Sequence, residues 1–253
     1  DGVEIQANYG GDVSVSVDGN VYADEFGILI DNGGESSPLP FDTYIDNTQV
    51  SVDAKIVGNN DALNLDHRVG GDVSILLGSS AELVGQTQTG ADIELTADGA
   101  YLTIQGASGS ISGAARGARL QTNNGSISVD GVDLVRGGTG AGLYVRPYGG
   151  ALTIENIAYV FSADCFAIDA DSRLTGLVCG ADISIQNVAI VKIDDGDPNT
   201  ADPFSYDGIR AYSGTGNINI GAADLAIGSG LGEIYSAYFG YYAESYGGDI
   251  SIY

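Results

Sequence analysis

An acidic stretch between residues 194 and 207 has the residue types and spacing of a cation site. Oxygen-bearing side chains occupy positions one, three, five and eight of the segment that starts at Asp195. Ca²⁺ is a hard cation that prefers several carboxylate and carbonyl oxygens, so this spacing predicts a calcium site. The segment lacks the central glycine and the closing glutamate that calcium loops often carry, and a solvated acidic loop is the alternative. The predicted ligands are Asp194, Asp195, Asp197, Asn199, Asp202 and Asp207.

A second group of carboxylates precedes this stretch, at Asp164, Asp169 and Asp171. Many polysaccharide-degrading enzymes use paired carboxylates to cleave glycosidic bonds. The Gly-His-Gly and Asn-Thr-Asp segments of polygalacturonase-like enzymes are absent from the sequence, however. We therefore predict that the chain is not an enzyme, and a polysaccharide-degrading enzyme that uses an Asp pair is the alternative.

The sole histidine, His67, offers little for nucleophilic catalysis. It lies between Asp66 and Arg68, just before Gly70 and Gly71, in a segment that reads as a corner. We therefore expect His67 to be an exposed turn residue, several coils away from either cysteine.

The two cysteines, Cys165 and Cys179, lie close together in the sequence. Glycine- and serine-rich β chains are typical of exported proteins, in which disulfides persist. We predict a disulfide between them, and two inert thiols in a core are the alternative.

Aromatic residues crowd near the end of the chain. Aromatic side chains bring a large contact area and are enriched at interfaces, although tyrosine also favours strands for ordinary reasons. We predict a surface that contacts a carbohydrate or another protein such as a cell-surface receptor. The aromatic residues are Tyr235, Tyr238, Phe239, Tyr241, Tyr242 and Tyr246.

The charge balance excludes some classes of partner. The 253 residues include 9 basic and 34 acidic side chains, which gives a net charge of −25. Binding to nucleic acid needs clustered Lys and Arg, so we expect no nucleic-acid partner. No apolar run approaches the length of a membrane helix, and we expect no membrane insertion.

The elements that position these residues are short strands. An apolar-hydroxyl-apolar pattern recurs along the chain, mostly with a glycine-containing corner shortly before it. Each copy reads as a strand with two apolar residues on one face, and the regular recurrence indicates a repeat architecture. We expect the first residues of the copies to stack as one inward-facing column. These residues are Val13, Val50, Val73, Leu102, Ile127, Leu152, Ile183, Ile218 and Ile250.

The repeat predicts an all-β fold. Variable coils of three short strands without helical periodicity are typical of a parallel β-helix, and parallel crossovers favour the right hand. We predict one domain, residues 1–253, that forms a right-handed β-solenoid of about eight coils. Loop insertions are expected near residues 31–48, 171–181, 194–207 and 229–240.

Three segments carry a resemblance to a known class of proteins. Gly-Asp-Val-Ser-Val-Ser-Val-Asp-Gly-Asn-Val at residues 11–21, Gly-Asp-Ile-Ser-Ile at 248–252 and Gly-Leu-Tyr-Val-Arg at 142–146 resemble passenger repeats of bacterial autotransporters and related filamentous adhesins. The resemblance implies secretion, a surface location and an adhesive or structural role.

The two ends of the sequence fall at matching phases of the repeat. Val3 and Ile5 read as the last strand of one coil, whereas Ile250 and Ile252, followed by Tyr253, open another. Open solenoid ends expose unpaired backbone groups and an apolar core. Either the chain was cut from a longer solenoid, or its ends meet those of neighbouring copies. We expect the second, a head-to-tail filament.

Overall fold

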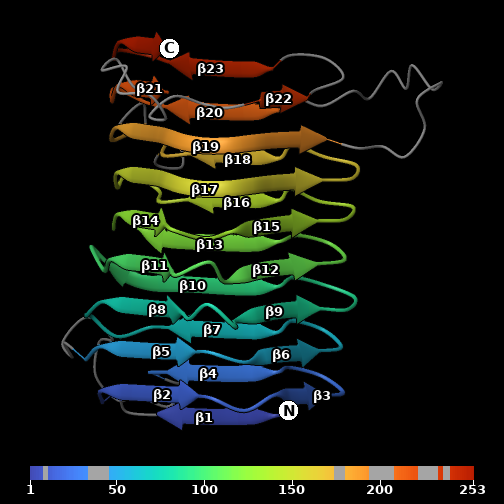
Figure 1. Cartoon of the computed structure of the whole chain (residues 1–253). Coiled ribbons are helices and arrows are strands. Elements are labelled where there is room, and N and C mark those ends of the chain that lie inside the picture. The colour runs from blue at the N-terminus through green and yellow to red at the C-terminus, as the bar shows by residue number, and fades with distance from the viewer. Residues whose placement is uncertain (8–10, 34–45, 174–179, 194–207, 222–232, 236–239) are drawn as a thin grey trace.

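The computed structural model describes residues 1–7, 11–33, 46–173, 180–193, 208–221, 233–235 and 240–253. In this part of the chain every regular element is a β-strand, and the strands pair in parallel. The chain winds as a right-handed parallel β-solenoid with its first and last strands at opposite ends (Figure 1). The predicted fold is therefore confirmed. The described residues contain no helix that is long and apolar enough to cross a membrane.

One wall of the solenoid is a nine-stranded parallel sheet that takes one strand from each successive coil. We call it the first wall. Its strands, in spatial order, are β1 (Val3–Ala7), β4 (Ile28–Asn32), β7 (Leu63–His67), β10 (Ala91–Asp98), β13 (Ala118–Asn123), β16 (Leu143–Arg146), β18 (Ile168–Asp171), β20 (Ile209–Ser213) and β23 (Tyr241–Ser245).

The opposite wall carries two rows of strands, which the 11-residue strands β17 (Leu152–Ser162) and β19 (Ile183–Ile193) join into one sheet. The row that follows the first wall along the chain also contains β2 (Val13–Val17), β5 (Thr48–Val52), β8 (Val73–Leu77), β11 (Leu102–Gly106), β14 (Ile127–Asp130), β21 (Ile218–Ile220) and β24 (Ile250–Ile252). The other row also contains β3 (Val21–Ala23), β6 (Lys55–Gly58), β9 (Glu82–Gly85), β12 (Ser110–Gly113), β15 (Leu134–Gly137) and β22 (Glu233–Tyr235).

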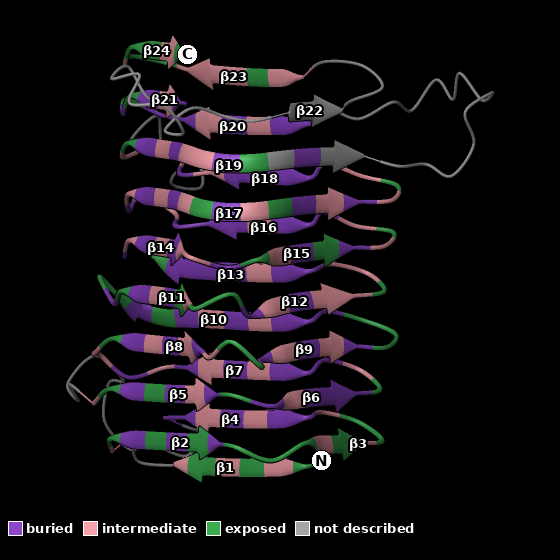
Figure 2. Cartoon of the chain, viewed as in Figure 1, coloured by how far each residue is buried: buried purple, intermediate pink, exposed green. Residues whose placement is uncertain are grey.

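Alternation along each strand builds the core. The apolar residues of the strands are buried, whereas the polar residues between them are more exposed, as the alternating colours along the strands show (Figure 2). Strands such as β2 and β8 therefore alternate between buried and more exposed residues. This period of two is the physical basis of the repeat seen in the sequence.

The inward column has one member that the sequence pattern assigned wrongly. Thr48, and not Val50, stacks between Val13 and Val73, while Val50 stacks between Val15 and Ile75. The apolar pattern missed Thr48 because a hydroxyl is rare in a core. Here the hydroxyl is buried and hydrogen-bonded, so the polar residue is tolerated.

A column of glycines forms the tight corner between the second row of the opposite wall and the first wall. Gly58, Gly85, Gly113 and Gly137 occupy the same place in four successive coils. A Cβ on Gly113 would lie 2.0 Å from the carbonyl oxygen of Arg116, so the corner closes only around glycine.

The structure also bounds the predicted insertions. The first lies between Asn32, which ends β4, and Thr48, which begins β5. The second follows β18, and an isolated antiparallel bridge joins Arg173 to Gly180 across residues 174–179, which lie outside the described residues. Residues 194–207 lie outside the described residues. The fourth predicted insertion contains the short strand β22, which pairs with β19.

Candidate interaction surfaces

The outer face of the first wall carries a network of arginine and aspartate that links β16, β18 and β20. Asp169 projects from β18 between Arg146 and Arg210 of the neighbouring coils. The Arg146 guanidinium donates to Asp169 Oδ2 at 2.9 Å and to the Asp169 carbonyl oxygen at 2.9 Å. Arg210 binds the same carboxylate with two nitrogens, at 3.1 and 2.6 Å. Asp169 is almost fully buried within this network.

Aromatic rings lie against these guanidinium groups. The Arg146 guanidinium carbon is 4.0 Å from the Tyr144 ring centre, and that of Arg210 is 3.7 Å from the Phe166 ring centre. Cation–π contacts of this kind are attractive and hold the planar groups in fixed orientations. The faces of the Tyr144 and Phe166 rings therefore contact arginine side chains of the same chain.

A second ion-pair cluster lies on the same face in earlier coils. Arg119 on β13 contacts Asp92 at 2.7 Å and Glu94 at 3.2 Å, both from the preceding strand β10. Burial raises the pKa of Asp92, and the Arg119 guanidinium opposes that shift by favouring the charged form. Here too the charged side chains connect one coil to the next.

The carboxylates that sequence analysis grouped do not form an open catalytic pair. Asp169 is buried between two arginines, and Asp171 is paired with Arg173 through two hydrogen bonds, at 2.8 and 2.7 Å. Asp164 lies on the exposed turn that precedes β18. A general acid and a general base must both reach a substrate, and two of these three groups are already engaged by guanidinium groups.

Polar side chains at the corner that precedes the first row of the opposite wall bind the backbone of the next coil. The backbone N–H of Asn47 donates to Asp12 Oδ1 at 2.8 Å, and the backbone N–H of Asp72 donates to Asn47 Oδ1 at 2.9 Å. The same geometry recurs near the other end, from Asn217 to Asp182 at 2.6 Å and from Asp249 to Asn217 at 2.9 Å. We call this series the corner ladder.

A second ladder runs along the bend within β17 and β19. Asn156 and Asn187 occupy this bend with φ angles of 54° and 49°, a left-handed conformation that asparagine tolerates. The side-chain amide of Asn156 donates to Asp130 Oδ1 at 2.7 Å, and the side-chain amide of Asn187 donates to Asn156 Oδ1 at 2.5 Å. Each side chain thus binds the preceding coil.

The structure corrects the prediction for His67. His67 is the last residue of β7, not part of the corner that follows. Its side chain faces inward and is fully buried. It lies next to Thr48, which also accepts a hydrogen bond from the Asn32 amide at 3.1 Å. Asn32 Oδ1 and His67 Nε2 are buried and form no hydrogen bond. Sequence reasoning missed this cluster because its three polar residues are scattered over 36 positions, from 32 to 67.

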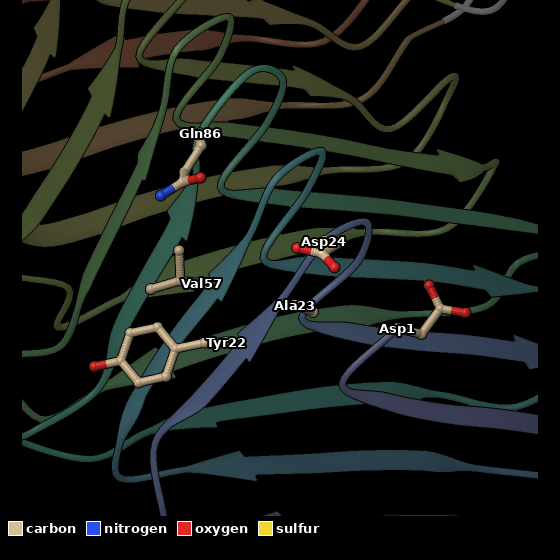
Figure 3. Close-up of a pocket in the computed structure, with 6 residues that line it drawn as sticks. All are labelled: Asp1, Tyr22, Ala23, Asp24, Val57 and Gln86. Carbon is tan, nitrogen blue, oxygen red and sulfur yellow. The ribbon is translucent and has the colours of Figure 1, made fainter.

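A surface hollow lies beside β3 (Figure 3). Tyr22 and Gln86 lie toward one end of it, and the carboxylates of Asp1 and Asp24 lie toward the other. Ala23 and Val57 complete the lining. Its mixed polar lining was not apparent from the sequence, because these residues come from three successive coils.

The structure leaves Cys165 with a free, partly buried thiol, and burial raises its pKa. Its predicted partner, Cys179, lies outside the described residues, so the disulfide between them stays a prediction.

The predicted aromatic surface is divided by the alternation of β23. Tyr241 packs against the core, whereas Tyr242 points outward with its ring centre 5.5 Å from that of Tyr212. Tyr246 is exposed beyond the strand. Tyr235 lies in β22, and Tyr238 and Phe239 lie outside the described residues.

The predicted calcium ligands, Asp194 to Asp207, also lie outside the described residues. Within the described ranges, no three His, Cys, Asp or Glu side chains are grouped so that they would hold a metal ion.

The strands predicted to mediate self-association lie at the two ends of the solenoid. β1 borders the first wall at one end, with Val3 and Ile5 packed partly against the core. At the other end β24 pairs with β21 and with no other strand among the described residues, and Ile250 and Ile252 are 44% and 47% exposed. Tyr253 follows them and is also exposed.

Comparisons with known proteins identified no relative of this chain. No family model, curated protein or solved structure matches the chain.

Proposed function

We propose that this chain is an extracellular structural or adhesive β-solenoid that acts as a rigid spacer, and that it is not an enzyme. One observation carries the proposal: charged and polar side chains along the solenoid, the candidate carboxylate Asp169 among them, bind the neighbouring coil. Asp169 binds two arginines of adjacent coils, Asp92 binds a third, and the two ladders bind side chain or backbone of the coil beside them.

These contacts act along the solenoid axis. Each coil touches only its immediate neighbours, so the stiffness of such a rod depends on the contacts between consecutive coils. Charge-assisted hydrogen bonds with two-pronged geometry are stronger and more directional than neutral ones. They add to the apolar core, which runs without interruption from β2 to β21.

The surface location rests on the resemblance to autotransporter passenger repeats and on composition. A net charge of −25 keeps a repetitive β protein soluble outside the cell and discourages lateral association of its strands. Under this proposal the role of the apolar-hydroxyl-apolar repeat is to form the strands that stack into a rod.

Two measurements test the proposal. Antibodies against the chain should label intact cells of the source organism, and protease treatment of those cells should remove the label. Label that appears only after permeabilisation would contradict the extracellular assignment.

The enzymatic alternative is tested with the purified chain on a panel of polysaccharides, with release of reducing ends as the readout. The parent and the Asp169→Asn and Asp171→Asn variants should all release no more than the buffer control. Cleavage by the parent that either variant abolishes would overturn the structural assignment.

A further inference from the structure

Two asparagines in the sequence, Asn32 and Asn124, are followed directly by glycine. An Asn-Gly pair is prone to deamidation, because glycine has no Cβ to shield the backbone nitrogen that attacks the asparagine side chain. The glycine nitrogen bonds to the side-chain carbonyl carbon, its proton passes to the leaving amide nitrogen, and ammonia is released. Water then opens the cyclic succinimide at either carbonyl and gives isoaspartate or aspartate. In a folded chain this reaction depends on how each pair is held.

The fold holds both reacting groups of the pair Asn32-Gly33. The Asn32 side chain is fully buried, and its amide nitrogen donates to the Gly11 carbonyl oxygen at 3.2 Å and to Thr48 Oγ1 at 3.1 Å. The backbone N–H of Gly33 donates to the Ala7 carbonyl oxygen at 2.9 Å. These groups are therefore released for reaction only when the solenoid opens locally.

The pair Asn124-Gly125 lies at the corner between β13 and β14 and is held differently. Asn124 is exposed, and its side chain forms no hydrogen bond with any of the described residues. The backbone N–H of Gly125 likewise donates to no acceptor in the part of the chain that the structure describes. The attacking nitrogen and the group that it attacks are thus both free of hydrogen bonds, and the Asn124 side chain can rotate toward that nitrogen.

The geometry of this corner favours the two residue types that form the reactive pair. Asn124 has a φ angle of 57°, a left-handed conformation that asparagine tolerates better than most residues. A Cβ on Gly125 would lie 1.8 Å from the Ala100 carbonyl oxygen, so glycine is the residue that fits there. The Gly125 carbonyl oxygen accepts a hydrogen bond from Thr122 Oγ1 at 2.5 Å, which holds the glycine in this close contact.

We propose that Asn124 is a site of spontaneous deamidation in the folded chain and that the fold protects Asn32. Each conversion replaces a neutral amide by a carboxylate and adds one negative charge at the corner. The isoaspartate product also inserts the β-carbon of residue 124 into the main chain, where Gly125 already packs closely against Ala100. The modification therefore alters the connection between two central strands, β13 and β14.

The test incubates the purified 253-residue chain in warm, mildly alkaline buffer and follows it by peptide mapping and mass spectrometry. Cleavage after Arg119 and Arg136 releases residues 120–136 as one peptide, and fragment spectra assign conversion within it to Asn124. Conversion at Asn124 should be at least about tenfold faster than at Asn32, because the buried pair reacts only through local opening. The product should be a mixture of isoaspartate and aspartate, since water can open either carbonyl of the succinimide.

The same chain unfolded in urea is the matched control. Unfolding removes the hydrogen bonds that hold Asn32 and Gly33, so the two pairs should convert at rates within about threefold of each other. Asn124→Gly provides the control variant in the folded state, because glycine accepts the left-handed conformation and has no side chain to deamidate. This variant should lose the conversion in residues 120–136 and leave the slow conversion of Asn32 unchanged.

Three results would overturn the proposal. The first is conversion of Asn32 as fast as that of Asn124 in the folded chain. The second is an unmodified Asn124 in the folded chain after a time in which the chain in urea has converted fully. The third is aspartate as the sole product at Asn124, which would contradict attack by the Gly125 nitrogen.

Discussion

His67 Nδ1 lies 3.2 Å from Thr48 Oγ1 inside the solenoid, and both side chains are buried. Thr48 Oγ1 also accepts a hydrogen bond from the Asn32 side-chain amide. The direction of the hydrogen bond between Thr48 and His67 depends on which ring nitrogen carries the proton. A polar side chain thus replaces an apolar one in the inward column without leaving its hydroxyl unpaired.

This cluster predicts a pH-dependent stability. Burial lowers the pKa of His67, an effect that the Gly71 carbonyl and the carboxylates Asp66, Asp46 and Asp72 oppose. The folded pKa therefore lies below the unfolded value of about 6.5. Stability from this group is complete above that value and is lost as the pH falls toward the folded pKa, by at most about 1.4 kcal/mol per pH unit.

Urea unfolding between neutral pH and pH 5 measures this effect. His67→Gln should remove the part of the pH dependence that belongs to this site, whatever its effect on stability at neutral pH. An unchanged slope in His67→Gln would show that His67 does not titrate between the folded and unfolded states in this range.

The inward column predicts a large cavity effect at its centre. Ile127 is fully buried, and Ile127→Ala should lower the free energy of unfolding by about 2 to 5 kcal/mol. Ser128→Ala, the adjacent outward residue, should change it by no more than about 0.5 kcal/mol. Equal effects of the two substitutions in chemical denaturation would contradict the assigned faces.

The glycine corner predicts a steric effect. The Cβ of Gly113→Ala would meet the Arg116 carbonyl, and relief requires a backbone shift that costs about 1 to 3 kcal/mol. Gly19→Ala is the matched control, because a Cβ there meets nothing within 4 Å. Thermal melts should separate the two variants, and equal melting temperatures would show that the corner relaxes freely.

The acidic segment at residues 194–207 predicts calcium-dependent stability. Calcium at about 100 times its dissociation constant should stabilise the chain by about 2.7 kcal/mol relative to chelator. The double variant Asp195→Asn/Asp197→Asn should lose this response, whereas Asp18→Asn/Asp98→Asn, which removes the same charge elsewhere, should keep it. The same melting temperature in calcium and in chelator for the parent would exclude a structural cation.

The architecture was predictable from the sequence because apolar and polar residues alternate with a period of two in the strands of successive coils. Glycine corners and small polar residues then left few alternatives to a parallel solenoid. Thr48 was missed because the apolar pattern cannot recognise a hydroxyl that a distant histidine satisfies. His67 was misplaced for the same reason, since its partners lie in other coils.

The candidate site was less predictable. Asp169 and Asp171 stood out as carboxylates, but their role depends on Arg146, Arg210 and Arg173. Of these, Arg146 and Arg210 lie 23 and 41 positions from Asp169 in the sequence. Only the coil register brings them together, and the lengths of the loop insertions decide that register. Sequence spacing alone therefore identified the groups and not their pairing.

The role of Asp169 tests the central claim most directly. If its carboxylate holds coils together, Asp169→Asn should lower the free energy of unfolding by about 3 kcal/mol, because two guanidinium groups lose their partner. A double-mutant cycle with Arg210→Gln should give a coupling energy of about 1 to 3 kcal/mol. Catalytic groups commonly reduce stability instead. Unchanged or increased stability of Asp169→Asn, with no coupling to Arg210, would contradict the structural role assigned to this face.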